Sequence, residues 1–157
     1  MENMIQKIIS GGQIGADRAA LDFAIEHNIP HGGWCPKGRL AEDGTIDVKY
    51  QLTETSTNIY DQRTQLNVMD ADGIVIFTIS PTLDGGSKFT ADFAVKHRKP
   101  WIHLSWKKTN DPGIELKRFI RQHQISILNI AGSRASIEPG IYEFTRSVLL
   151  RAFGKQN

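Results

Sequence analysis

A glycine-rich segment near the N-terminus has the composition of an anion-binding loop. Gly11, Gly12, Gln13 and Gly15 follow a short apolar run and precede a helical pattern that begins at Asp17. Glycine lets the backbone approach a ligand closely, and the first turn of a helix presents unpaired N–H groups to negative charge. The spacing is neither G-x-G-x-x-G nor a P-loop, because no Gly-Lys-Ser/Thr follows. We therefore expect these residues to bind an anion that is not a dinucleotide, with a tight βα turn as the alternative.

Asp17 brings a negative charge to the place where a phosphate would otherwise bind. An acidic side chain at a helix N-terminus can cap the helix by accepting backbone N–H groups. The same carboxylate can accept hydrogen bonds from a donor edge, such as the amino-pyrimidinone of guanine or of a pterin. We expect Asp17 to fill one of these roles or both.

A second loop, residues 33–44, combines glycine and proline with charges of both signs. Lys37 and Arg39 suit an oxyanion, whereas Glu42 and Asp43 suit the donor groups of a ligand. The alternative is a surface turn whose charges are solvated. The single cysteine, Cys35, has no evident base partner in the sequence and is expected to pack in the interior.

Residues 81–87 form another glycine-rich loop that, like residues 11–15, leads from a strand into a helix. Gly85 and Gly86 precede Ser87, which can cap that helix, and Thr90 adds a hydroxyl group. Two such loops in one small α/β domain could face each other across a cleft.

Arg63 and Asn67 lie four residues apart, so they share one face of a helix. They offer a cation and an amide to a ligand, or they belong to an exposed polar face. A turn from Asp70 to Gly73 then precedes the most apolar run in the chain.

Short β-rich runs alternate with helical patterns along the chain. The expected strands are residues 7–10, 74–79, 101–104 and 126–131, and the expected helices are 17–28, 87–97, 113–122 and 140–153. Such alternation is typical of a Rossmann-like α/β fold, with a mostly parallel sheet and helices on both faces. Ligands bind outside the carboxyl ends of such strands, which places the site at residues 11–17, 34–44, 80–87 and 131–140.

Length, charge and composition narrow the function classes. A chain of 157 residues fits a single domain, 1–157, and the net charge of +2 lacks the basic excess of nucleic-acid binders. No apolar run approaches the ~18 residues of a membrane span, and no signal peptide is evident, so we expect a soluble cytoplasmic protein. The histidines lack zinc-ligand spacing, and no nucleophile–base or paired-carboxylate motif stands out. We therefore expect neither a metal site nor catalytic residues.

Several motifs, read in order, resemble the molybdenum carrier (molybdenum-cofactor carrier protein) family. They are Ser10–Asp22, Gly33–Gly44, Arg63–Val68, Gly85–Ser87 with Thr90, Leu128–Arg134 and Pro139–Tyr142. The resemblance runs from Ile8 to about Phe153. It implies a Rossmann-like protein, usually a homotetramer, that binds molybdenum cofactor (molybdopterin), protects it and passes it to apo-molybdoenzymes without catalysis. The apolar excess of the last helix, residues 140–153, is consistent with an oligomer.

The resemblance also implies how the cofactor would be held. Carboxylates suit its pterin edge, glycine-loop N–H groups with Lys37 and Arg39 suit its phosphate, and arginines suit its oxo groups. The expected binding residues are Gly11, Gly12, Gln13, Gly15, Asp17, Arg18, Lys37, Gly38, Arg39, Glu42, Arg63, Asn67, Gly85, Gly86, Ser87, Thr90 and Arg134. A related anion remains an alternative ligand.

Two other functions are weighed against a carrier. The family is similar to the lysine decarboxylase-like group of phosphoribohydrolases, which carry Pro-Gly-Gly-x-Gly-Thr-x-x-Glu. The matching stretch, residues 84–92, lacks Gly-Thr and has Asp92 in place of the glutamate, which disfavours that chemistry. A sensor that binds a nucleotide-like signal is the third hypothesis, weakened by the absence of an appended effector domain.

Overall fold

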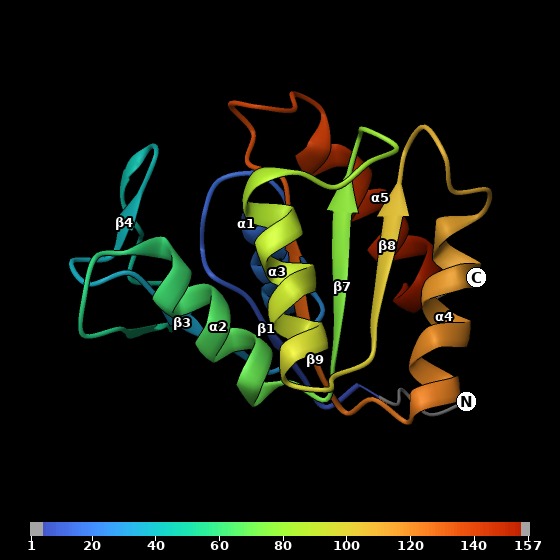
Figure 1. The fold of residues 1–157 in the computed structure, drawn as a ribbon, viewed down its shortest axis with the longest axis horizontal. Helices are drawn as coiled ribbons and strands as arrows, with labels where there is room; N and C mark the ends of the chain where they lie inside the picture. Colours follow the sequence, from blue (N-terminus) through green and yellow to red (C-terminus); the bar gives the residue numbers. More distant parts are fainter. Residues whose placement is uncertain (1–4, 155–157) are drawn as a thin grey trace.

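A five-stranded parallel sheet forms the centre of the protein, as seen in a computed structural model that describes residues 5–154 (Figure 1). The strand order is β2-β1-β9-β7-β8, and every pair is parallel. The strands are β1 (Lys7–Ile9), β2 (His31–Gly32), β7 (Gly73–Thr78), β8 (Trp101–Ser105) and β9 (Ile127–Gly132). The last strand of the chain therefore lies at the middle of the sheet.

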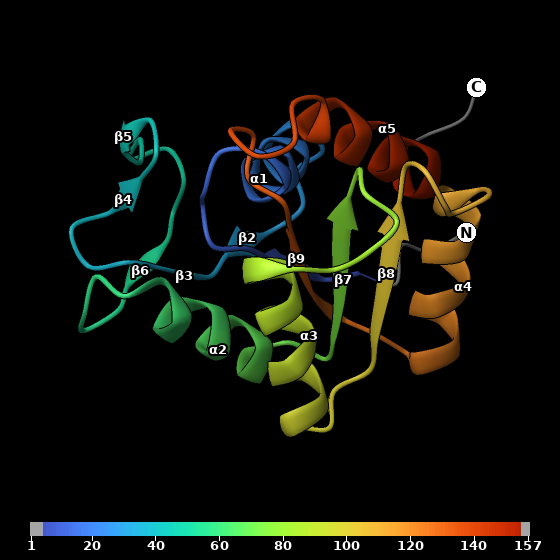
Figure 2. The ribbon, with the colours of Figure 1, turned by 45° about the horizontal axis from the view of Figure 1, so that its top comes forward.

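Helices cover both faces of this sheet (Figure 2). They are α1 (Ala16–Glu26), α2 (Tyr60–Asp70), α3 (Gly85–Lys96), α4 (Pro112–His123) and α5 (Ile141–Phe153). Helices α1, α4 and α5 pack on one face, and α2 and α3 pack on the other. The expected Rossmann-like architecture, with a parallel sheet between two helical layers, is confirmed.

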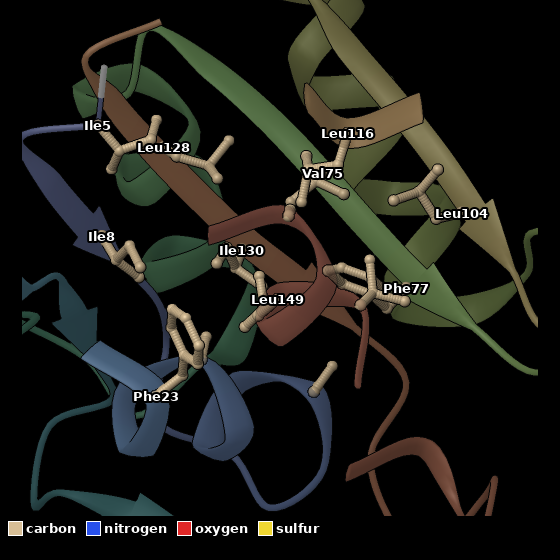
Figure 3. Close-up of a cluster of buried hydrophobic side chains, with 14 of the residues drawn as sticks. Ile5, Ile8, Phe23, Val75, Phe77, Leu104, Leu116, Leu128, Ile130 and Leu149 are labelled. Carbon is tan, nitrogen blue, oxygen red and sulfur yellow. The ribbon is translucent and has the colours of Figure 1, made fainter. Parts of the chain in front are cut away.

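The central strand β7 shows why two helical layers are needed. All six of its residues are buried. Val75 and Phe77 face the larger core cluster, which Figure 3 shows closing around Phe23 and Leu149. The alternating side chains of Ile74 and Ile76 point to the opposite face and meet α2 and α3. A strand without polar alternation is buried on both sides, as its sequence predicts.

The helix starts differ in detail from the sequence expectations. Neither Asp17 nor Ser87 caps its helix, because α1 begins after Gly15 and α3 begins after Asp84, each without a side-chain capping bond. Both residues lie within the first turn instead. Helix α4 is capped by Asp111, whose carboxylate accepts the N–H of Ile114 at 3.3 Å. The glycines at 85 and 86 are thus helical rather than loop residues.

Residues 33–59, between β2 and α2, leave the central sheet and are called the excursion. The sequence did not predict the secondary structure of this segment. It contains β3 (Trp34–Cys35) paired with β6 (Thr53–Glu54), and a small hairpin of β4 (Leu40–Ala41) and β5 (Gly44–Thr45). The excursion is anchored on α1 by a small cluster in which Cys35, Ile46 and Tyr50 surround Leu21. Cys35 packs in the interior, as expected.

The last helix, α5, buries most of its apolar surface against other helices of the same chain. It packs against both α1 and α4, which buries Ile141, Phe144, Val148 and Leu149. Leu150 is the large apolar α5 residue that remains exposed, at 44%. The apolar excess of this helix therefore no longer argues for an oligomer. Along residues 5–154, no helix combines the length and apolar character of a membrane span.

Candidate functional site: a cavity at the carboxyl edge of the sheet

A cavity of about 260 Å³ opens where β1 and β9 end, between the first turns of α2 and α3. The strand order changes direction here, since the chain leaves β1 toward β2 and leaves β7 toward β8, on opposite sides of β9. Such switch points are where open parallel sheets bind ligands. The expected binding residues that line the cavity are Gly11, Gln13, Asp17, Arg63, Asn67, Gly85, Gly86, Ser87, Thr90 and Arg134.

The first turn of α3 offers unpaired N–H groups to this cavity. The first three residues of the helix, Gly85, Gly86 and Ser87, have no intrahelical acceptor, and the first such bond joins Lys88 N–H to Asp84 O. Apart from its chain neighbours and the backbone of its own helix, a Cβ atom built on Gly85 or Gly86 would meet no atom of residues 5–154 within 4 Å. The turn is therefore open to a close approach by an anion.

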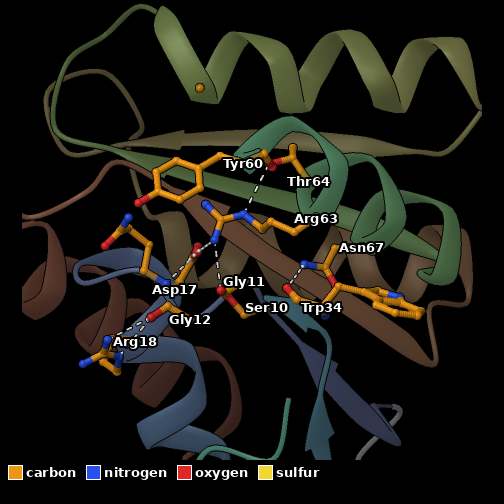
Figure 4. Close-up of polar contacts among 12 residues, drawn as sticks. Ser10, Gly11, Gly12, Asp17, Arg18, Trp34, Tyr60, Arg63, Thr64 and Asn67 are labelled. Carbon is orange, nitrogen blue, oxygen red and sulfur yellow. Dashed lines mark hydrogen bonds and ion pairs between the residues drawn. The ribbon is translucent and has the colours of Figure 1, made fainter. Parts of the chain in front are cut away.

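Arg63 reaches from α2 across the cavity to the loop after β1 (Figure 4). Its Nη1 donates to the carbonyl of Gly11 at 2.9 Å and lies 3.8 Å from Oδ2 of Asp17. The guanidinium also stands 5.2 Å from the ring centroid of Tyr60. The two charged side chains are only 11% and 10% exposed, so their interaction is little screened by solvent.

Asp17 supplies a buried carboxylate to the cavity wall. Its Oδ2 accepts the N–H of Gln13 at 3.2 Å. Burial raises the pKa of Asp17, against the opposing effects of Arg63, the Gln13 N–H, Ser10 and Arg18. The environment therefore favours the protonated form more than water does, and a protonated carboxyl can both donate and accept hydrogen bonds.

Gln13 carries a buried donor that is left without a partner. Its Oε1 accepts the N–H groups of Ile14 and Glu42, at 3.1 and 2.8 Å. Its Nε2 has no hydrogen-bond partner among residues 5–154, although the residue is only 4% exposed. An unsatisfied buried donor is costly, so a ligand acceptor at this point would be well bound.

Seven of the expected binding residues lie outside the cavity. They are Gly12, Gly15, Arg18, Lys37, Gly38, Arg39 and Glu42. A Cβ on Gly12 would meet Leu52 and Ile46 at 2.8 and 2.9 Å. A Cβ on Gly15 would lie 2.6 Å from the carbonyl of Ser133. These two glycines are required by packing.

Three of the four charged residues among the seven, Arg18, Arg39 and Glu42, use their side chains to bond to the protein itself. Arg18 donates to the carbonyl of Gly12 and to Asp43. Arg39 donates to the carbonyls of Ile46, Asp47, Tyr50 and Leu52, at 2.8 to 3.4 Å. In the structure this guanidinium supports the chain of the excursion, and contact between Arg39 and a ligand stays a prediction. Lys37 is exposed on the same loop.

Asn67 lines the cavity but also ties α2 to β3. Its amide accepts the N–H of Trp34 at 2.8 Å and donates to the carbonyl of the same residue at 3.0 Å. Both ends of the amide are thus engaged in holding the first strand of the excursion against the helix.

The cavity lining also contains residues that were not among the expected binding residues, namely Tyr60, Asp61, Thr64, Phe89, Asn129, Ser133 and Ile137. Ser133 and Ile137 fall within the expected range 131–140. Asn129 had a detectable signal, because it is a polar residue inside an apolar strand and is only 3% exposed. Nothing in the sequence marked Tyr60 or Phe89, since isolated aromatic residues occur on any surface. Along residues 5–154, no three His, Cys, Asp or Glu side chains cluster as metal ligands would.

The strand order, the two helical layers and the cavity at the carboxyl edge define a Rossmann-like α/β protein. The chain belongs to the circularly permuted YpsA SLOG family, whose model matches residues 8–153. It is also similar to a solved structure of a protein from Syntrophus aciditrophicus SB named "Putative molybdenum carrier protein". The identity is 46%, 98% of each chain is covered, and the TM-score is 0.94. No curated protein matches the chain significantly.

Proposed function

We propose that this protein is a carrier that binds molybdenum cofactor (molybdopterin) at the carboxyl-edge cavity, protects it and passes it unchanged to apo-molybdoenzymes. The name of the similar Syntrophus protein supports a molybdenum-related ligand. The observation that carries the proposal is the donor set of the cavity. The uncapped first turn of α3, two arginines and Gln13, whose buried Nε2 has no hydrogen-bond partner among residues 5–154, all belong to the lining of one cavity.

The donors and acceptors of the cavity fit the parts of such a ligand. A terminal phosphate suits the first turn of α3, because unpaired N–H groups and the helix dipole both favour an anion. Oxo groups suit the guanidinium groups of Arg63 and Arg134, which line the same cavity. Asp17 is placed to accept hydrogen bonds from the amino-pyrimidinone edge of a pterin.

The size of the cavity is consistent with transfer. Sites that enclose a drug-sized ligand usually hold roughly 300–1,000 Å³. A cavity of about 260 Å³ would therefore leave part of the cofactor outside. A recipient enzyme could then contact the ligand before the carrier releases it. The proposal includes a homotetramer in the cytoplasm, which sedimentation velocity and cell fractionation would test.

The decisive experiment is to purify the protein from cells with an active cofactor pathway and to measure bound molybdenum and the oxidised pterin product. Wild type should retain both in equal amounts and should activate a cofactor-free molybdoenzyme on mixing. Lys37→Ala, on the excursion loop outside the cavity, is the matched control and should retain as much. Wild type without either component would overturn the proposal.

The enzyme alternative has a separate test. A phosphoribohydrolase would use Asp92, the register match to the family glutamate. Asp92 is on α3 but does not line the cavity, and its carboxylate pairs with Lys88 at 3.1 Å. Wild type should therefore release no free base from nucleoside monophosphates. Release of base that is lost in Asp92→Asn would replace the carrier with an enzyme.

A further inference from the structure

The β4–β5 hairpin brings two acidic residues next to the cavity but not into it. Its antiparallel pairing leaves Glu42 and Asp43 as the two-residue turn at the tip. Each of them binds an arginine: Glu42 pairs with Arg134, and Asp43 pairs with Arg18. Arg134 lines the cavity, whereas Arg18 does not. One turn thus holds a carboxylate that is connected to the binding residues and a second carboxylate that is not.

Glu42 makes three contacts with segments far away in the sequence. Its Oε2 accepts Nη1 of Arg134 at 3.1 Å, and its Oε1 accepts the hydroxyl of Ser136 at 2.7 Å. Its backbone N–H donates to Oε1 of Gln13 at 2.8 Å. The tip of the hairpin therefore joins the loop after β1 to the loop after β9, and both loops line the cavity.

The contact with Arg134 sets the direction of a ligand-facing cation. The backbone of Arg134 pairs with Gly15, and its guanidinium lies 5.6 Å from the ring centroid of Tyr60. An arginine carries five N–H donors in one rigid plane, so a carboxylate bound to one nitrogen orients the others. A free arginine would instead lose side-chain entropy when it bound the ligand.

The charge of Glu42 argues against direct contact with an anionic ligand. A carboxylate next to an oxyanion repels it, and this carboxylate is already engaged by Arg134 and Ser136. Gln13 is held by the backbone of residue 42, so its orientation does not depend on the Glu42 side chain.

We propose that Glu42 is a positioning residue of the cavity, which orients Arg134 toward an oxyanion-bearing ligand and does not touch that ligand itself. This inference rests on the proposed function, because it assigns the residue that organises the same site. It predicts that the effect of Glu42 on binding passes entirely through Arg134.

A double-mutant cycle tests this coupling, with inorganic molybdate and inorganic phosphate as calorimetric probes and with cofactor retention after co-expression. Arg134→Ala should weaken binding roughly tenfold or more, because a charge-assisted hydrogen bond is lost. Glu42→Ala should weaken it by about three- to tenfold, and by less than twofold in the Arg134→Ala background. Glu42→Gln should restore binding, because the amide oxygen still accepts from Arg134. An equal loss in both backgrounds would show direct ligand contact and overturn the proposal.

Asp43→Ala is the matched control, since it removes the neighbouring carboxylate and frees an arginine outside the cavity. Its binding should stay within about twofold of wild type. In ligand-free protein, Glu42→Ala should shift the side-chain nitrogen signal of Arg134 in NMR spectra and leave the Gln13 amide signal in place. An unchanged Arg134 signal would overturn the positioning role even if binding fell. Wild type that binds none of the probes would instead overturn the proposed function, and the Arg134 signal would still decide the positioning.

Discussion

Nη1 of Arg63 lies between Oδ2 of Asp17 and the carbonyl oxygen of Gly11, at 3.8 and 2.9 Å. One guanidinium therefore connects α2 to the loop after β1 and carries charge into the cavity. Two sets of contacts hold α2 in place over the site. Arg63 binds the loop after β1, and Asn67 binds the backbone of Trp34 in β3.

The balance between burial and Arg63 leads to a pH dependence at Asp17. Its pKa is raised chiefly by burial, so the folded state binds this proton more tightly than the unfolded chain does. That contribution to stability is complete below the ordinary value of 3.8 and is lost as the pH rises through the folded-state value. Asp17→Asn should therefore gain stability relative to wild type as the pH increases from 3 to 7. Urea unfolding at several pH values measures the difference in free energy of unfolding between Asp17→Asn and wild type. If this advantage of Asp17→Asn shrank as the pH rises, the raised pKa of Asp17 would be contradicted.

Arg39 should act on stability and not on the ligand. Arg39→Ala removes donors from four backbone carbonyls, so the free energy of unfolding should fall by about 2 kcal/mol or more. Lys37→Ala, two residues away and exposed, should change it by less than about 0.5 kcal/mol. Chemical denaturation compares the two. Below the unfolding transition, both variants should bind molybdate like wild type, and weaker binding by folded Arg39→Ala would return this residue to the ligand site.

The two glycine loops should respond differently to the same substitution. A valine at position 86 extends into open space in the first turn of α3, so Gly86→Val should stay folded and lose at least about tenfold in anion binding. A valine at position 12 meets Leu52 and Ile46, and the backbone there has φ +83°, so Gly12→Val should lose about 2 kcal/mol or more of stability. Thermal unfolding and calorimetry separate the two effects. Full binding by Gly86→Val would remove this helix end from the site.

Glu138 should hold the loop after β9 in a pH-dependent manner. It accepts the N–H groups of Ile79 and Ser80 at 2.9 and 2.8 Å and the hydroxyl of Ser133 at 2.5 Å. Burial alone would raise the pKa of Glu138, but these hydrogen bonds outweigh burial and lower it. A lowered pKa means that the stabilisation is present above the ordinary value of 4.5 and is lost as the pH falls through the folded-state value.

Glu138→Gln should therefore be less stable than wild type by about 1–3 kcal/mol at pH 7, with a smaller difference at pH 3. The exposed Glu143→Gln on α5 is the control, and its effect should be a few tenths of a kcal/mol. Denaturation curves at both pH values give the comparison. A difference that does not depend on pH would mean that the charge of Glu138 plays no part.

The sequence predicted four of the five strands of the sheet, and β7 and β9, which are largely apolar runs, fall within one residue of the expected ranges. The edge strand β2 was not expected, because it consists only of His31 and Gly32. The sequence also placed both glycine loops at one edge, since the carboxyl ends of parallel strands lie together. The roles of the charged residues could not be derived in the same way. A sequence lists donors but does not show which are already used, so Arg39 looked available although four carbonyls of its own excursion engage it.

Long-range pairs are a second kind of contact that the sequence does not show. Arg134 and Glu42 are far apart in the chain, and their ion pair depends on where a two-residue hairpin tip comes to rest. Helix starts were misjudged for a related reason, because the Asp17 carboxylate accepts from Gln13 N–H rather than from the first turn of its own helix. Local propensity does not determine such tertiary contacts.

The central position of β9 has a consequence for how the protein is made. Before residues 127–132 leave the ribosome, β1–β2 and β7–β8 are two separate strand pairs with no partner between them. Each pair then exposes an apolar edge, and Leu128 and Ile130, which are fully buried in the finished sheet, are made only after the other four strands. Pairing across such sequence distances is slow and leaves a window for aggregation. The nascent chain is thus expected to depend on chaperones until β9 inserts, and chains that stop short of residue 127 should not fold.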